Sequence, residues 1–257
     1  MRSLSLALAM LMLVMVASVV YAADSSDDTL ILYLSLDEGD GTTAGDLSQY
    51  GNDGELNGDP QWVAGKFGDA LKFNGTSDWV EVPHADILTV DTDVTVMAWI
   101  NPERHEGPGG ARWQGILAKG NGPRSYSFYT EIPSTGLHFS VGGSGSVSAE
   151  TVALNEWQHV VAQVIGDAHK FYINGQLAGE FPGKNPPPGL ADTANVLVGK
   201  THEGSREFLG LIDEVKIWNR ALDEAEIVDE MNKGADTGTA VEPQNKLATT
   251  WGALKQR

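Results

Sequence analysis

Apolar residues in this chain gather in short runs that turn-forming residues interrupt at close intervals. From Val94 to Ile100, apolar residues at every second position share one face, which is the period of a half-buried β-strand. Asn174-Gly175 separates two such runs and is typical of a type I′ hairpin turn, because both central residues of that turn need positive φ. Short strands with turn signals every ~8–12 residues indicate an antiparallel sandwich or barrel.

The same pattern predicts strands along most of the chain and one helix near its end. The predicted strands cover 29–36, 71–74, 79–82, 94–100, 116–118, 126–130, 137–141, 157–165, 170–173, 196–198 and 208–218. The helix is expected to begin at Asp223, with Glu226 completing a capping box, and to end at Gly234. Residues 235–257 are mostly polar or small, so we expect a tail outside the core.

The N-terminus carries the pattern of a targeting signal. Arg2 precedes an apolar run from Leu4 to Val20, and Val20-Tyr21-Ala22 offers small residues at the positions that a signal peptidase requires. We therefore predict a secretory signal peptide over 1–22 and a short acidic linker over 23–29. The alternative is an uncleaved membrane anchor.

Charge and cysteine content narrow the classes of function. The formal net charge of −18 disfavours nucleic acid or an anionic membrane surface as the main partner. The absence of cysteine excludes disulfides, thiolate metal sites and cysteine nucleophiles. An exported protein without disulfides must be stabilised by its core alone, and the length allows a core of that size.

Motifs that carry catalysis are largely missing. The sequence contains neither Gly-x-Ser-x-Gly nor His-Glu-x-x-His. Asp213-Glu214 is the one acidic pair inside a predicted apolar strand, and adjacent strand residues are expected to point to opposite faces. Glu81 stands alone in its strand, so no strand is expected to present the two carboxylates of a glycosidase. Acids of predicted loops are the alternative source of such a pair: Glu103, Glu106 and Glu131.

Several sequence blocks occur in an order that resembles a known family. The blocks are 37–41, 46–54, 65–75, Ala98-Trp99, 157–162, 172–176 and 210–222. Over about residues 30–234 the chain resembles a laminin G-like domain of the concanavalin A-like jelly-roll superfamily, although Gln49-Tyr50 departs from the usual glycine-containing turn. The resemblance implies an all-β fold, in which two antiparallel sheets pack as a jelly-roll sandwich with one short C-terminal helix.

Aromatic residues are candidates for both core and ligand contacts. Trp99 and Trp157 lie in predicted strands and are expected in the core between the sheets. Trp113, Tyr126 and Tyr129 lie in or just after a segment rich in glycine, proline and arginine, so we assign them as candidate platforms for a sugar ring. The alternative for all of these residues is a purely structural role in the core.

Calcium is the cofactor that the acidic loop over 37–54 indicates, because hard cations take carboxylate, amide and carbonyl oxygens. In the resembled superfamily, a structural calcium often joins the N-terminal region to an aspartate of the last long strand, and Asp213 matches that place. The resemblance implies Asp46 or Asn52 and the carbonyl of Gly75 as further ligands. The alternative is a solvated acidic loop, with Asp213 paired to a lysine or arginine.

These observations predict a secreted, extracytoplasmic and non-catalytic module that binds a glycan or a protein polymer outside the cell, for example in adhesion. Two alternatives remain open. One is a glycan hydrolase or lyase on the same fold. The other is a structural component of a surface assembly, which would dock through the end of the tail, residues 242–257.

Overall fold

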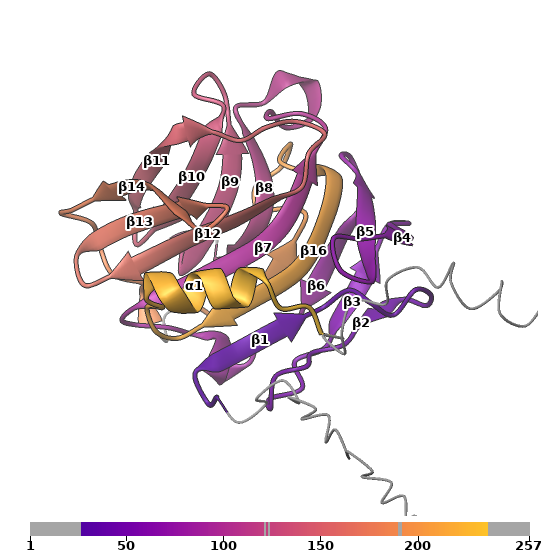
Figure 1. The fold of residues 1–257 in the computed structure, drawn as a ribbon, viewed down its shortest axis with the longest axis horizontal. Coiled ribbons are helices and arrows are strands. Elements are labelled where there is room, and N and C mark those ends of the chain that lie inside the picture. The colour runs from indigo at the N-terminus through magenta and orange to yellow at the C-terminus, as the bar shows by residue number, and fades with distance from the viewer. Residues whose placement is uncertain (1–26, 121, 123, 190–191, 236–257) are drawn as a thin grey trace, which may run out of the picture.

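The computed structural model describes residues 27–120, 122, 124–189 and 192–235 (Figure 1). The predicted signal peptide and almost all of the predicted tail lie outside these residues. Within them, two antiparallel sheets pack face to face with one α-helix, as the sequence predicted. No helix of the described part is long and apolar enough to cross a membrane.

The first sheet has the order β14-β13-β12-β7-β16-β5-β4, and β1 pairs with β16. Its strands are β1 (Leu30–Leu34), β4 (Gln61–Ala64), β5 (Asp69–Asn74), β7 (Val94–Pro102), β12 (Gln158–Ile165), β13 (Ala168–Ile173), β14 (Gln176–Phe181) and β16 (Leu209–Trp218). Asn174 and Gly175 have φ values of 50° and 75°, which confirms the predicted hairpin turn between β13 and β14.

The second sheet has the order β11-β10-β9-β8-β15-β6-β3-β2. Its strands are β2 (Thr43–Ala44), β3 (Gly54–Asn57), β6 (Trp79–Val82), β8 (Trp113–Lys119), β9 (Tyr126–Glu131), β10 (Gly136–Val141), β11 (Ser144–Thr151) and β15 (Val196–Val198). The turn between β10 and β11 is Gly142-Gly143, and β11 begins at Ser144.

The core lies between the two sheets. Val94, Val96, Ala98 and Ile100 all belong to it, which confirms the predicted inner face of β7. Burial of each such valine or isoleucine contributes about 1.5–3 kcal/mol, so this alternation determines which face of β7 turns inward.

Helix α1 (Glu224–Met231) lies over the outer face of the first sheet (Figure 1). The predicted capping box is confirmed, since Asp223 accepts a hydrogen bond from the Glu226 amide and Glu226 accepts one from the Asp223 amide. Ile227 packs against residues of the sheet in a second apolar cluster. The helix ends at Met231, before Gly234, whose missing Cβ instead makes room for Phe67.

Trp99 does not lie between the sheets, so that prediction was wrong. Its ring lies on the outer side of β7, where its centroid is 6.3 Å from that of Phe67 and 5.5 Å from that of His159. Its Nε1 donates to the carbonyl of Met231 at the end of α1. Trp157 precedes β12 and is half-buried.

The prediction that Asp213 and Glu214 point to opposite faces was also wrong. A β-bulge interrupts the register of β16 with β7 at this point, and Glu214 has a φ of 53°. Ile212 and Val215 both lie in the core, so the two acids between them turn to the outer side together. Both are almost fully buried there, at 0% and 2% exposure.

Candidate functional site

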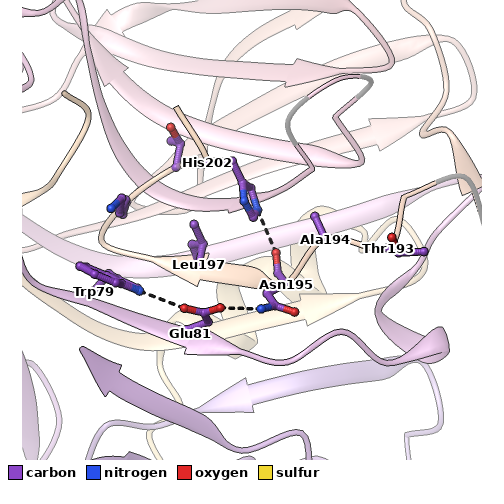
Figure 2. A pocket seen from close by; sticks show the side chains of 9 residues that line it. Trp79, Glu81, Thr193, Ala194, Asn195, Leu197 and His202 are labelled. Carbon is purple, nitrogen blue, oxygen red and sulfur yellow. Dashed lines mark hydrogen bonds between the residues drawn. The ribbon is translucent and has the colours of Figure 1, made fainter. Parts of the chain in front are cut away.

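The outer face of the second sheet carries a pocket of about 430 Å³ (Figure 2). Binding sites for small molecules typically measure ~300–1,000 Å³. We call this hollow the Trp79 pocket. It is lined by Trp79, Glu81, Thr193, Ala194, Asn195, Leu197, Lys200, Thr201 and His202.

The side chains of β6 point alternately to the two faces of the sheet, and this places Trp79 and Glu81 in the pocket. Val80 and Val82 are fully buried in the core, so Trp79 and Glu81 project from the opposite face of the strand. Leu197 lies beside Glu81 in the neighbouring strand β15 and is almost buried in the middle of the pocket (Figure 2). The pocket therefore joins an aromatic ring, an apolar floor and a carboxylate.

Hydrogen bonds hold the Glu81 carboxylate in place (Figure 2). Trp79 Nε1 donates to Oε2 at 3.3 Å, and Asn195 Nδ2 donates to Oε1. The His84 amide donates to Asn195 Oδ1, and His202 Nε2 donates to the Asn195 carbonyl at 3.0 Å. A carboxylate offers about four acceptor positions, so Glu81 can accept further hydrogen bonds from a ligand.

Lys200 supplies a cation at the same pocket. Its Nζ lies 4.1 Å from the centroid of the Trp79 ring, a cation–π geometry. It also lies 3.7 Å from Glu207 Oε1, within ion-pair distance. Lys200 therefore covers part of the indole and offers N–H donors beside it.

A buried lysine supports the wall of the Trp79 pocket from below. Lys119 has no exposed surface, and its Nζ donates to the carbonyls of Asp192 and Ala194 at 3.2 and 2.6 Å. Burial lowers the pKa of Lys119 from its usual value, although the Asp192 carboxylate opposes that shift. These bonds attach the segment that carries Thr193 and Asn195 to the sheet.

The three aromatic residues that the sequence assigned to sugar binding do not line this pocket. Tyr126 lies in the core with 0% exposure, and its hydroxyl donates to the carbonyl of Leu88, so its assignment as a platform was wrong. Trp113 and Tyr129 both lie beside Arg206, but Tyr129 is only 1% exposed. The segment rich in glycine, proline and arginine contains strand β8, which begins at Trp113.

Guanidinium groups already occupy the surroundings of these two rings. Arg206 Cζ lies 4.5 Å from the ring centroid of Trp113 and 5.5 Å from that of Tyr129. Arg112 Cζ lies 5.1 Å from the Trp113 ring. A sugar would have to displace two guanidinium groups before it could stack on Trp113, whereas a single lysine lies over Trp79.

Glu131, one of the predicted loop acids, lies in β9 beneath Trp113 and is 2% exposed. Its carboxylate accepts hydrogen bonds from Trp113 Nε1 at 3.0 Å and from His138 Nδ1 at 2.9 Å. Burial acts to raise the pKa of Glu131, but hydrogen bonds from Arg112 and His138 lower it overall. The group is therefore held ionised and is a poor proton donor. Glu103 is paired elsewhere, with Lys72.

A second carboxylate lies beside the Trp79 pocket on a different strand. Glu55 is the direct partner of Glu81 in the antiparallel pairing of β3 with β6, so both project from the same face. Glu81 is the one acid of β6, as the sequence predicted, and the second carboxylate comes from the neighbouring strand β3. The pattern of acids within single strands does not reveal this pair, because the two acids come from separate segments of the chain.

The residues predicted to bind calcium make hydrogen bonds to other parts of the chain. Asp46 Oδ1 accepts hydrogen bonds from the amides of Tyr33 and Ser48, and Oδ2 accepts them from Ser48 Oγ and the Asn52 amide. The Asn52 amide side chain donates to the carbonyl of Ile31. These groups stabilise the loop by themselves.

The other two predicted ligands are also engaged. The Gly75 carbonyl accepts a hydrogen bond from the Arg104 guanidinium at 2.8 Å. Asp213 Oδ2 accepts from the amides of Lys66 and Phe67, while Oδ1 is buried without a partner. Burial raises the pKa of Asp213 to about 8. The described residues contain no group of three His, Cys, Asp or Glu side chains that could hold a metal ion.

Comparison with known families identifies the fold family. A family model described as "Concanavalin A-like lectin/glucanases superfamily" matches residues 74–228. The chain belongs to this superfamily. The predicted resemblance is thus confirmed. A curated relative, adhesion G-protein coupled receptor V1 of Danio rerio, is 23% identical over an alignment of 134 residues, and the match covers 48% of this chain and 2% of that protein.

Solved structures show the same fold in proteins of distant sequence. Domain 4 of AbnA, an extracellular GH43 arabinanase from Geobacillus stearothermophilus solved in complex with arabinotriose, has a TM-score of 0.63 and 22% identity, covering 79% of this chain and 98% of that one. The binding domain of Paraclostridial Mosquitocidal Protein 1 has a TM-score of 0.66 and 17% identity, covering 80% and 52%. A structure of botulinum neurotoxin type C, whose cell entry depends on two ganglioside molecules, has a TM-score of 0.61 and 16% identity, covering 80% and 51%.

Proposed function

We propose that this protein is a secreted, non-catalytic module that binds a glycan in the Trp79 pocket. The observation that carries the proposal is the junction of an indole ring, an apolar floor and a fixed carboxylate in one hollow of the sheet. Sugars combine apolar ring faces with hydroxyl donors, so a site for them needs both kinds of surface. A pocket lined by an aromatic ring and a few placed polar groups meets that need.

The geometry lowers the cost of binding because the polar groups are already oriented. Glu81 is fixed between Trp79 and Asn195, so a sugar hydroxyl that donates to it meets an acceptor that need not be reordered. Lys200 provides donors for a hydroxyl oxygen on the other side. Leu197 provides apolar contact at the floor.

Similar proteins support a glycan as the ligand class. Domain 4 of the arabinanase was solved with arabinotriose, and the botulinum neurotoxin depends on gangliosides. Export is part of the same proposal and rests on the apolar segment at 4–20. If export occurs by signal cleavage, mass spectrometry of exported protein will give an N-terminus at Ala23.

A hydrolase is the second candidate, and the juxtaposition of Glu55 and Glu81 is the observation in its favour. Glycosidases use two carboxylates, with a raised pKa on the acid. Release of reducing ends from a bound polysaccharide separates this candidate from a binding module.

Isothermal titration with arabinotriose, followed by affinity electrophoresis on a panel of plant and bacterial polysaccharides, tests the proposal. Trp79→Ala should weaken binding roughly tenfold or more, which corresponds to about 1.4 kcal/mol. Trp113→Ala is the matched control, because it removes the same ring from another strand of the same sheet, outside the pocket, and should leave affinity unchanged. The proposal would be overturned if the wild-type protein retained no glycan, or if Trp113→Ala lost binding while Trp79→Ala kept it.

A further inference from the structure

Negative charge predominates at the Trp79 pocket. Glu81 lines it, and Glu55 projects from the same face directly across the strand pair. Glu55 is exposed, and no cation of the described residues pairs with either carboxylate. Two like charges face each other here, an arrangement that weakens a sheet and therefore is not explained by stability.

The cations near the Trp79 pocket are already matched by carboxylates. Lys200 is the one lysine or arginine among the residues that line the pocket, and it pairs with Glu207. Two arginines close to the pocket-lining residues in the sequence or through their partner, Arg124 and Arg206, both pair with Glu203, which directly follows His202. Each of these cations therefore has little free charge to offer a ligand.

The charge of the whole chain acts in the same direction. With a net charge of −18, the protein repels anions before they reach the pocket. Inside the pocket, Leu197 excludes water from part of the floor, which strengthens the interaction between Glu81 and any charge nearby.

We propose that the Trp79 pocket selects uncharged sugars and rejects sugars that carry carboxylate or sulfate groups. The inference rests on the proposed function and specifies its ligand class. A neutral sugar satisfies Glu81 by donating hydroxyl hydrogens, whereas an acidic sugar places a second anion beside it. No described cation at the pocket is free to compensate that anion.

The test uses one polymer in two charge states. A neutral polysaccharide that the wild-type protein retains is compared with the same polymer after its primary hydroxyl groups have been oxidised to carboxylates. At low ionic strength we expect the oxidised polymer to bind roughly tenfold more weakly, and the difference to shrink at 1 M salt, where the Debye length is about 3 Å. Equal or tighter binding of the oxidised polymer would overturn the inference while leaving the proposed function intact.

Two variants test whether the selectivity for neutral polymers arises at the Trp79 pocket. Glu55→Lys replaces the exposed acid with a cation outside the lining, so it should retain the neutral polymer and restore binding of the oxidised one. Asp53→Lys is the matched control, since it makes the same charge change at another exposed acid, which is not in the register of β6. If both variants restore binding equally, the selectivity comes from overall charge and the pocket assignment is wrong. If the wild-type protein retains neither form of any polymer, the proposed function itself fails.

Discussion

The indole N–H of Trp79 donates a hydrogen bond to Glu81, two residues further along the same strand. Because residues i and i+2 project from one face of a strand, this bond joins the aromatic ring and the carboxylate into a single rigid surface. Asn195 completes it from the segment before β15. The candidate site therefore depends on local strand geometry for one half and on tertiary contacts for the other.

Glu81→Gln should weaken glycan binding roughly tenfold, because hydrogen bonds to a charged group are worth about 1.5–3 kcal/mol. Glutamine keeps the shape but replaces one acceptor oxygen with a donor, which then faces Trp79 Nε1 or Asn195 Nδ2. Isothermal titration measures the change in affinity, and the melting temperature serves as the check on folding. An unchanged affinity would remove Glu81 from the binding surface.

The protein should bind polysaccharide without depolymerising it. Glu81 accepts two hydrogen bonds from the protein, and Glu131 is held ionised by Arg112 and His138, so neither described group is set up as a proton donor. Incubation with each retained polymer should release no reducing ends. Release that disappears in Glu81→Gln or Glu55→Gln would establish the hydrolase instead.

Lys119→Met should destabilise the fold by about 3–5 kcal/mol, because it leaves the buried carboxylate of Asp192 without its cation. The loss lowers the melting temperature by roughly 2–4 °C per kcal/mol for a chain of this size. Combining Lys119→Met with Asp192→Asn removes both charges and should recover part of the stability. If the double variant is no more stable than the single one, the ion pair is not the source of the effect.

Two buried histidines should each lower the stability of the protein as the pH drops below about 6.5, while the raised pKa of Asp213 acts in the opposite direction. Burial lowers the pKa of His169 to about 4 and that of His159 to about 3, so the native state resists a proton that the unfolded chain accepts near pH 6.5. Each neutral histidine therefore makes a contribution to the free energy of unfolding that is fully present above pH 6.5. This contribution is lost as the pH falls toward the pKa of the native state. Neither ring nitrogen of His169 has a partner.

His169→Leu isolates this contribution. The variant cannot bind a proton at position 169. Between pH 6.5 and 4, its free energy of unfolding should therefore fall by about 3 kcal/mol less than that of the wild type. Denaturant unfolding at a series of pH values measures the two slopes. His202→Leu is the control, since that residue lies at the Trp79 pocket and not in the core. Parallel slopes for wild type and His169→Leu would contradict the assignment.

Calcium and chelator should give the same melting temperature. Arg104 holds the Gly75 carbonyl, and both oxygens of Asp46 already accept hydrogen bonds from the protein, so the predicted donors are not free to converge on an ion. Thermal unfolding with excess chelator and with millimolar calcium measures the difference. A rise with calcium would reveal a site that rearranges on binding and would restore the prediction made from the sequence.

Missed strands show where sequence patterns are weak. The strands β2, β3, β4 and β11 are short or carry few apolar residues, so their alternation does not stand out from the turns around them. Trp99 and the pair Asp213-Glu214 were misplaced for another reason. A bulge and a helix packed on the outer face decide their surroundings, and neither changes the local period.

The sequence by itself determined the class of fold, because the alternation of β7, the Asn174-Gly175 turn and the capping box at Asp223 act over a few neighbouring residues. It also placed Trp79 and Glu81 on one strand, though without a reason to single them out. Only the tertiary structure decided that Asn195 and Lys200 meet them, that Glu55 lies opposite Glu81, and that guanidinium groups cover Trp113. Those relationships depend on strand order across the sheet, which joins segments far apart in the chain and leaves no periodic trace within any one of them.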